Sequence, residues 1–368
     1  MSAPPEIPVE GITLDELQLA ARNHGLPLEA LRYDVTPLGL HYLLIHYDIP
    51  AVDADSWRLT IDGRVARSRS LSLADLRERE AAELVATMEC AGNGRARLSP
   101  RPISQPWLLE AVGTARWRGV PLRHLLDEAG LLEDVVEIVF TGLDRGFEKG
   151  VEQSYQRSLP VDAASAGEVI LAFEMNDAPL LPQHGFPLRL VVPGWYGMTN
   201  VKWLTAITAV AEPFEGYQHL EAYRLRADEE AEGSPLTRMR PRALMVPPGI
   251  PDFHTRARSV PLAPCRLEGR AWSGWAPVTR VEVSTDGGKT WDRAELEPQE
   301  SRWAWRRWTY EWRPHEPGAY TLCCRAEDAA GNMQPPEGRW NVGGYANNEP
   351  QRVPVMVQER GYDQAAPE

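Results

Sequence analysis

Residues 233–264 form a proline-rich segment that separates two stretches of different character. Seven prolines lie in it, at positions 235, 241, 247, 248, 251, 261 and 264, with few periodic apolar residues between them. Such a segment is typical of a linker or of an ordered wrap between domains. A chain of 368 residues is long enough for two independent cores. We therefore predict a peripheral segment at 1–35, a mixed domain at 36–232, a linker at 233–264 and a second domain at 265–362.

The two predicted domains differ in the periodicity of their apolar residues. Before the break, helical and strand-like patterns mix without a regular β–α–β rhythm, which predicts an α+β fold. We expect helices at 13–22, 73–80 and 122–129, and strands at 57–63, 83–88, 135–140 and 188–192. Beyond the break, a hairpin turn at Asp286-Gly287-Gly288 and alternating runs predict an all-β sandwich. These runs lie at 279–285, 289–291, 308–312 and 320–326.

Charge and apolar content exclude several classes of protein. With 52 acidic and 39 basic residues, the net charge of −13 argues against nucleic acid as the main partner. No apolar run approaches the roughly 20 residues that span a bilayer. The first residues include neither a basic leader nor a twin arginine, so we expect a cytoplasmic protein. We expect Cys265, Cys323 and Cys324 to be buried thiols outside any disulfide framework.

The fourth cysteine, Cys90, stands at the end of a strand-like run, directly before the short loop Ala91-Gly92-Asn93-Gly94-Arg95. A thiol there can point out of a rigid strand edge, while Gly92 and Gly94 let the backbone approach a bulky ligand closely. The charge of Arg95 would favour the thiolate. With no second cysteine or histidine in reach, a thiolate suits a metal that brings most of its own ligands. We predict a cofactor site rather than a structural zinc site.

The loop from Cys90 to Arg95 resembles the molybdenum-ligating loop of the sulfite oxidase family of molybdopterin enzymes. Further blocks similar to those of the family follow in the same order, covering Trp107, Thr114–Leu122, Phe173–Asn176, His184–Gly194 and Val201–Leu204. The resemblance implies a mononuclear molybdenum held by one pyranopterin dithiolene, with Cys90 as the only protein ligand. It also implies that residues 265–362 form an immunoglobulin-like domain through which the protein is a homodimer.

The same resemblance assigns roles to individual side chains. It implies that five residues hold the cofactor, with cations on its phosphate and a carboxylate on its pterin: His46, Asp144, His184, Arg189 and Lys202. It implies that four residues face the substrate, the last one reaching in from the second domain: Arg95, Trp107, Tyr223 and Arg306. Arginine suits this second role because its planar fork matches an oxyanion of sulfur.

The sequence departs from the family at one substrate-binding position. Residues 41–50 align with the family's Arg-Asn-His block through His46, and the arginine position then falls on Leu44. Loss of a guanidinium removes a charged hydrogen bond that contributes about 1.5–3 kcal/mol, so sulfite should bind less tightly. An upstream string, Arg22-Asn23-His24, has the wrong downstream spacing, and we expect it to end a helix. The alternative is that Arg22 folds back into the pocket.

Three functions are compatible with these observations. The leading hypothesis is molybdenum-dependent oxygen-atom transfer on sulfite or a related small sulfur oxyanion, with electrons passed to an external acceptor such as a cytochrome. The second is reduction of a neutral sulfoxide or a similar S-oxide or N-oxide, because Leu44 makes the pocket less positive. The third is a cofactor-free dimeric scaffold, against which the joint presence of Cys90, Arg189 and Lys202 argues.

Overall fold

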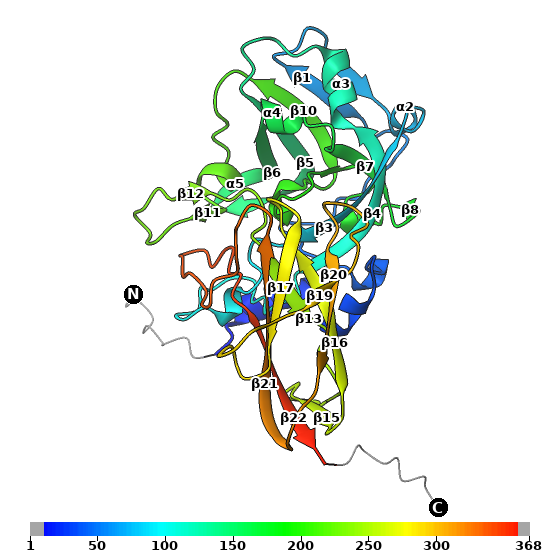
Figure 1. Cartoon of the computed structure of the whole chain (residues 1–368). Coiled ribbons are helices and arrows are strands. Elements are labelled where there is room, and N and C mark those ends of the chain that lie inside the picture. Colours follow the sequence, from blue (N-terminus) through cyan, green and yellow to red (C-terminus); the bar gives the residue numbers. More distant parts are fainter. Residues whose placement is uncertain (1–10, 360–368) are drawn as a thin grey trace, which may run out of the picture.

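The computed structural model describes residues 11–359 and divides the chain into two parts. In Figure 1 a mixed part with sheets and short helices lies above, and a long two-sheet sandwich, coloured yellow to red, lies below. An α+β unit is thus followed by an all-β unit, as the sequence predicts. Among residues 11–359 we find no helix with the length and apolar character needed to cross a membrane.

Two five-stranded sheets build the first part. One has the order β2-β1-β10-β5-β6, with β1 and β10 parallel. Its strands are β1 (Leu59–Gly63), β2 (Arg69–Leu71), β5 (Glu137–Glu148), β6 (Val151–Pro160) and β10 (Leu204–Val210). The other has the order β3-β4-β7-β8, and its fifth strand, β9, pairs with β7. Its strands are β3 (Ala82–Glu89), β4 (Val112–Pro121), β7 (Ile170–Met175), β8 (Ala178–Pro179) and β9 (Arg189–Val191).

The helices are short, and their ends follow local sequence signals. Ser72 caps α2 (Leu73–Arg77) through a reciprocal capping box with Asp75, although the helix ends before the predicted residue 80. The predicted helix at 122–129 is confirmed as α3 (Leu122–Ala129), which ends at Gly130 with a left-handed φ of 70°. The remaining short helices of this part are α4 (Val161–Ala164), α5 (Tyr217–Leu220), η2 (Leu38–Leu40), η3 (Arg95–Arg97), η4 (Pro182–His184) and η5 (Gly197–Thr199).

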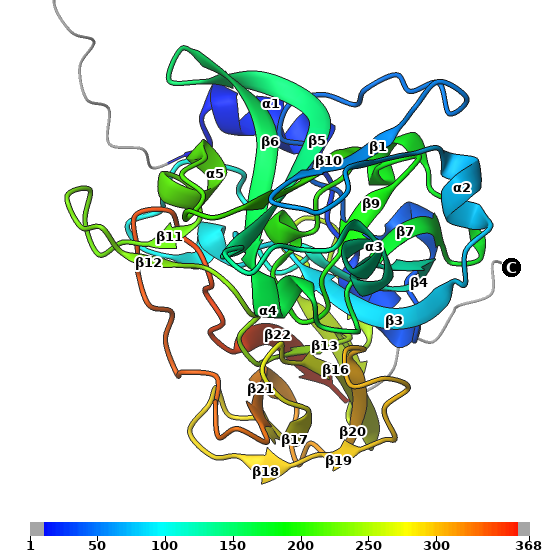
Figure 2. The ribbon, with the colours of Figure 1, turned by 90° about the horizontal axis from the view of Figure 1, so that it is seen from above.

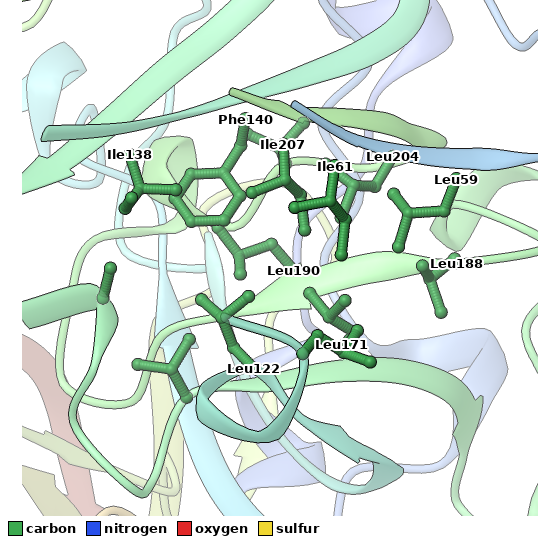
Figure 3. Packing of buried hydrophobic residues seen from close by; sticks show 14 of the residues in the cluster. Leu59, Ile61, Leu122, Ile138, Phe140, Leu171, Leu188, Leu190, Leu204 and Ile207 are labelled. Carbon is green, nitrogen blue, oxygen red and sulfur yellow. The ribbon is translucent and has the colours of Figure 1, made fainter. Parts of the chain in front are cut away.

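The main core of the first part lies between its two sheets. Ile61, Ile138 and Phe140 come from one sheet and face Leu171 and Leu190 from the other, as Figure 3 shows. Helix α3 adds Leu122 and its following apolar face to the same cluster. This packing fixes the two sheets against each other and with them the loops at their edges.

Two further sheets form the sandwich of the second part. The smaller has the order β13-β16-β20-β19, and the larger has the order β14-β15-β22-β21-β17-β18. The strands of the two sheets together are β13 (Arg242–Met245), β14 (Ile250–Pro251), β15 (Arg258–Pro261), β16 (Cys265–Trp272), β17 (Val278–Ser284), β18 (Asp292–Arg293), β19 (Glu295–Leu296), β20 (Arg306–Trp312), β21 (Gly318–Asp328) and β22 (Gln351–Gln358). At the predicted hairpin turn, Gly287 and Gly288 have φ of 78° and 92°.

The proline-rich segment differs from the expected linker. It contains β13, which pairs with β16, and β15, which pairs with β22 and with β14. Ala243 and Met245 of β13 belong to the sandwich core. Only β11 (Arg224–Leu225) and β12 (Ser234–Pro235) form a separate two-stranded ribbon. The prolines punctuate short strands, so the segment is an ordered part of the second unit.

The N-terminal residues are also less peripheral than predicted. Helix α1 (Leu14–Arg22) has the expected capping box at Thr13, and η1 (Leu28–Arg32) contacts β13 and β16 of the sandwich. Leu26 and Leu31 are buried together with residues of both parts. Arg270 of β16 donates to the Leu31 carbonyl at 2.7 Å. Residues 1–10, which belong to the same predicted segment, lie outside the described residues.

Candidate active site

Cys90 directly follows the last residue of β3 and begins a tight loop. Its backbone N–H donates to the Ala111 carbonyl (2.9 Å), and its own carbonyl accepts from the Asn93 N–H (3.0 Å). The Cys90 side chain is 6% exposed. It lies in the wall shared by two cavities, an inner one of about 60 Å³ and an outer one of about 350 Å³. Cys90 therefore lines both cavities while hydrogen bonds hold its backbone in place.

A buried ion pair between the two parts of the chain supports this loop. Glu89, the last residue of β3, meets Arg242 of β13 with 2.7 Å between Oε1 and Nε, at an angle unsuited to a hydrogen bond. Trp272 Nε1 donates to Glu89 Oε2 (2.9 Å), and Asn93 Nδ2 donates to Glu89 Oε1 (3.0 Å). Arg242 Nη2 donates to the Asn93 carbonyl (3.3 Å). The sandwich thereby helps to set the position of the Cys90 loop.

The inner cavity gathers all five residues that the sequence assigns to cofactor binding. His46, Asp144, His184, Arg189 and Lys202 line it together with Cys90. They come from β5, η4, β9 and two loops, so no single stretch of sequence could have shown them to be neighbours. Residues that sequence reasoning missed also line this cavity, among them His41, Tyr42, Tyr155 and Asn200.

Two cations of the inner cavity, the buried Arg189 and the half-buried Lys202, bond only to uncharged acceptors within the described residues. Arg189 donates from Nη1 to the His184 carbonyl (3.0 Å) and lies 4.8 Å over the Trp117 ring. Lys202 Nζ donates to the carbonyls of Leu44 (2.8 Å) and Gln183 (3.2 Å). Burial lowers the pKa of Arg189 to about 10 and that of Lys202 to about 7. An anion between these cations would relieve the cost of burying them.

Other polar atoms of the same wall have no hydrogen-bond partner in the described part of the chain. They are His41 Nε2, Asp144 Oδ1 and Arg189 Nε. Burial raises the pKa of Asp144 to about 6, although the charge of Lys202 opposes this shift. An unpaired buried donor, Arg189 Nε, and two unpaired acceptors, His41 Nε2 and Asp144 Oδ1, around one cavity are the complement of a ligand with an anionic group and polar ring edges. The residues present thus fit a pterin cofactor with a phosphate.

Cys90 offers a metal one thiol, without a ready-made set of protein ligands around it in the described part of the chain. Within residues 11–359, no three His, Cys, Asp or Glu side chains come together as a metal-binding group. A metal at Cys90 therefore needs its remaining ligands from a cofactor, as the sequence argument requires. Burial raises the pKa of the Cys90 thiol and outweighs the nearby charge of Arg95, so Arg95 alone does not produce the expected thiolate. A bound metal would deprotonate the thiol.

The outer cavity contains three of the four predicted substrate-facing residues, namely Arg95, Trp107 and Tyr223. Arg95 is buried, and its Nε and Nη1 donate to the carbonyls of Gly343 (2.8 Å) and Gln105 (3.1 Å). Its guanidinium carbon lies 5.1 Å from the centre of the Tyr345 ring. These contacts hold a positive charge at the cavity wall in one orientation.

His46 and Tyr223 connect the two cavities through a short hydrogen bond between Nε2 and the phenol oxygen. Burial raises the pKa of Tyr223 well above its usual value and lowers the pKa of His46 to about 3. Both groups are therefore neutral at pH 7, and the Tyr223 O–H donates to the His46 nitrogen. The predicted cofactor ligand and the predicted substrate residue act as one unit.

The structure does not place Arg306 at the substrate face expected from the sequence. Arg306 begins β20 and pairs in register with Ala271, and it lines neither cavity. Its Nε donates to the Glu297 carbonyl (2.7 Å) and its Nη1 to the Val278 carbonyl (2.9 Å). All these partners belong to the sandwich. The arginine ties strands of the second part together because its donors are satisfied there.

The loop glycines also serve a different purpose from the one expected. A Cβ on Gly92 would lie 2.8 Å from the guanidinium carbon of Arg95. Gly94 has a left-handed φ of 90°, and a Cβ there would lie 2.8 Å from the Asn347 carbonyl oxygen. The two glycines thus make room for Arg95 and for the second part of the chain, rather than chiefly for a ligand.

Arg22 agrees with both alternatives left open by the sequence, the end of a helix and a side chain in the pocket. It is the last residue of α1, as expected, and it also lines the outer cavity beside His46. Gln105 and Tyr345 line the same cavity and were missed. Gln105 lies between the predicted Arg95 and Trp107, which is the only sequence signal that could have found it, whereas nothing local marks Tyr345.

Comparisons with known proteins match both parts of the chain. Residues 46–218 match the family described as oxidoreductase molybdopterin binding domain, and residues 255–358 match the Mo-co oxidoreductase dimerisation domain. The chain is 36% identical over 330 residues to the sulfite oxidase of Gallus gallus, covering 84% of this chain and 70% of that protein. It is 34% identical over 346 residues to the mitochondrial sulfite oxidase of Rattus norvegicus, covering 88% and 62%.

More distant similarities extend this result. A nitrate reductase of Hordeum vulgare is 32% identical over 353 residues, covering 88% of this chain and 39% of that protein. The chain therefore spans about three fifths of the rat protein and about two fifths of the barley protein. The crystal structure of the sulfane dehydrogenase SoxCD from Paracoccus pantotrophus has a TM-score of 0.78 at 24% identity, covering 97% of this chain and 95% of that one. This similarity shows a shared fold.

Proposed function

The chain belongs to the sulfite oxidase family of molybdopterin-dependent oxidoreductases, and from this premise we propose that it oxidises sulfite or a related small sulfur oxyanion. For sulfite the balanced reaction is sulfite plus water to sulfate, two protons and two electrons. The electrons pass to an external acceptor, for which a cytochrome is one candidate. The reaction rests on the family and on one feature of the site, the position of Cys90.

That feature is Cys90, which lines both the inner, cationic cavity and the outer cavity of about 350 Å³, whose volume is sufficient for a small substrate. A cofactor held in the inner cavity would meet a small molecule from the outer one at this residue. When bound, the molybdenum cofactor supplies the two-electron redox chemistry and the oxygen-atom transfer. The protein supplies the orientation of both partners.

Each group of residues has a distinct task in this account. Arg189 and Lys202 would neutralise the cofactor phosphate, and Asp144 would accept from pterin N–H groups. Arg95, fixed by two carbonyls, would bind and orient the oxyanion. The neutral Tyr223–His46 pair can hold a proton at the Tyr223 oxygen without adding charge to the cavity.

A second candidate function is the reduction of a neutral S-oxide or N-oxide. The observation in its favour is Leu44, whose side chain lines both cavities at the position of the family's substrate arginine. Trp107 and Tyr345 add apolar surface to the outer cavity. Apolar side chains at these positions tolerate an uncharged substrate, because they carry no charge that a substrate would have to neutralise.

The test is a pair of assays on protein purified from a host that makes molybdopterin. We expect sulfite to drive reduction of ferricyanide, and dimethyl sulfoxide or trimethylamine N-oxide to leave reduced methyl viologen unoxidised. The opposite pattern would contradict oxyanion oxidation and support the reductase. Protein boiled before assay is the control for direct reaction of sulfite with the acceptor.

Assembly and location are further parts of the proposal. The match of residues 255–358 to a dimerisation domain supports a homodimer, which sedimentation would test. The immunoglobulin-like character of the sandwich and a cytoplasmic location remain predictions from the sequence. Cell fractionation tests the latter.

A further inference from the structure

The outer cavity has a second guanidinium that no family block assigns. Arg22 ends α1 and lines this cavity together with Arg95. Its Nη2 donates to the His46 carbonyl at 3.3 Å, across the chain from the helix. Leu44, two residues before His46, lines the same cavity with an apolar side chain. A positive charge thus stands close to the segment where the family pattern has its arginine and this chain has leucine.

The residues after Arg22 are attached to the 43–46 segment like the edge of a small sheet. His24 N–H donates to the Leu43 carbonyl (3.2 Å), and Leu43 N–H donates back to the His24 carbonyl (2.8 Å). Between them, the Asn23 side chain accepts from the Ile45 N–H at 2.7 Å. Asn23 is buried, 7% exposed. Backbone and side-chain bonds therefore fix the position from which Arg22 extends.

The same contacts connect Arg22 to Arg95. Asn23 Nδ2 donates to Gln105 Oε1 (2.9 Å), and the Gln105 carbonyl accepts from Arg95 Nη1 (3.1 Å). Asn23 thus bonds both to the 43–46 segment, which accepts from Arg22, and to Gln105, which accepts from Arg95. Further along α1, Glu16 is fully buried and pairs with Arg101, which ties the helix to the segment after the Cys90 loop. Glu148, at the end of β5 in the arched β5–β6 hairpin of Figure 2, also lines the cavity.

The charges of the cavity favour an anion. Of the residues that line it within the described chain, those with formally charged side chains are Arg22, Arg95 and Glu148. Tyr223 and His46 are neutral there for the reasons given above. Two guanidiniums against one carboxylate leave a net positive wall around Cys90, and guanidiniums bind oxyanions with paired N–H donors.

We propose that Arg22 is a substrate-binding residue that supplies from helix α1 the guanidinium missing at Leu44, so that Arg22 and Arg95 together bind the sulfur oxyanion. This inference rests on the proposed function, since it concerns the substrate of the same site. It also accounts for an anionic substrate in a pocket that has lost the family's arginine. The substrate-binding guanidinium then comes from position 22 instead of position 44, and both positions line the same cavity.

The experiment compares Arg22→Ala with the wild type and with Arg32→Ala. Arg32 is a matched control because it is also an exposed arginine in the last turn of a short N-terminal helix, and it lies outside the cavity. Loss of one charged hydrogen-bonding partner should raise the KM for sulfite about 10- to 100-fold. We expect kcat and molybdenum content to change little, and Arg32→Ala to behave like the wild type.

A double variant tests the relocation directly. In Arg22→Ala/Leu44→Arg the guanidinium returns to the family's position, and we expect most of the lost affinity to return with it. Sulfate binding, measured by calorimetry, provides a readout that does not need turnover, and its Kd should follow the KM. Arg22→Gln, which removes the charge but retains a donor for the His46 carbonyl, guards against a merely structural effect and should also weaken both.

Three outcomes would overturn the inference. The first is an unchanged KM and sulfate Kd in Arg22→Ala. The second is an equal loss in Arg32→Ala. The third is a double variant no better than the single one. If the wild type itself neither oxidises sulfite nor binds sulfate, the proposed function fails, and the inference fails with it. If the wild type does both and Arg22→Ala is unchanged, only the inference about Arg22 fails.

Discussion

Replacement of Arg242 by Met should destabilise the protein strongly by leaving the Glu89 carboxylate buried without a positively charged partner. Glu89 and Arg242 are 1% and 2% exposed, and their charged atoms are 2.7 Å apart. Removal of one member of a buried pair costs about 3–5 kcal/mol, chiefly because the remaining charge cannot be solvated. Arg242 Nε and Nη1 have no hydrogen-bond partner in the described chain, which places the expected cost at the lower end, about 3 kcal/mol.

The measurement is urea unfolding followed by tryptophan fluorescence, together with hydrogen exchange of the loop at 90–94. Arg123→Met is the matched control, because Arg123 pairs with Asp127 on the exposed face of α3 and should cost at most about 0.5 kcal/mol. In Glu89→Gln/Arg242→Met the neutral amide still accepts from Trp272, so we expect much of the stability to return. The reasoning is refuted if Arg242→Met costs less than about 1 kcal/mol, or if the double variant is no more stable than the single one.

Three further predictions concern the site. Cys90→Ser should give a folded dimer without sulfite oxidation, since the backbone bonds of the loop do not involve sulfur; an unfolded circular dichroism spectrum would instead indicate a packing role. In cofactor-free protein, burial puts the pKa of Lys202 at about 7, below the 10.5 of the free side chain. The unfolded chain therefore binds more protons between these values, and stability should rise with pH by up to about 1.4 kcal/mol per unit there. Lys202→Met should flatten this rise in pH-dependent urea titrations, and an identical slope would contradict the assignment. Arg306→Ala should lower stability by about 1–3 kcal/mol and leave the KM for sulfite unchanged; a tenfold increase in KM would restore its sequence-based role.

Local signals in the sequence predicted local structure well. The capping boxes at Thr13 and Ser72 and the apolar face of 122–129 act within one or two turns, so the helices begin where the sequence places them. The ends of strands were harder to predict, because they depend on hydrogen bonding to neighbouring strands. The strand expected at 135–140 is Glu137–Glu148, since it continues as a hairpin with β6 whose exposed residues have no apolar pattern.

Contacts distant in sequence account for the residues that were misplaced. Arg306 was assigned by its place in a block, but strand register directs its donors to carbonyls at 278 and 297. Arg242 lies in a segment interpreted as a linker, so nothing in the sequence indicated that it would pair with Glu89. The approach of Arg22 to His46 depends on Asn23 and Gln105 meeting across 82 residues, which spacing cannot reveal.

The central claim is that the two cavities meeting at Cys90 form a molybdenum cofactor site. The most direct test is the molybdenum content per chain of protein purified from a host that makes molybdopterin, with Arg189→Ala/Lys202→Ala purified in parallel. The account predicts about one molybdenum per wild-type chain and a strong loss in the double variant, because the two cations that would hold the phosphate are gone. A wild-type content near zero would contradict the account and leave a family fold without its chemistry.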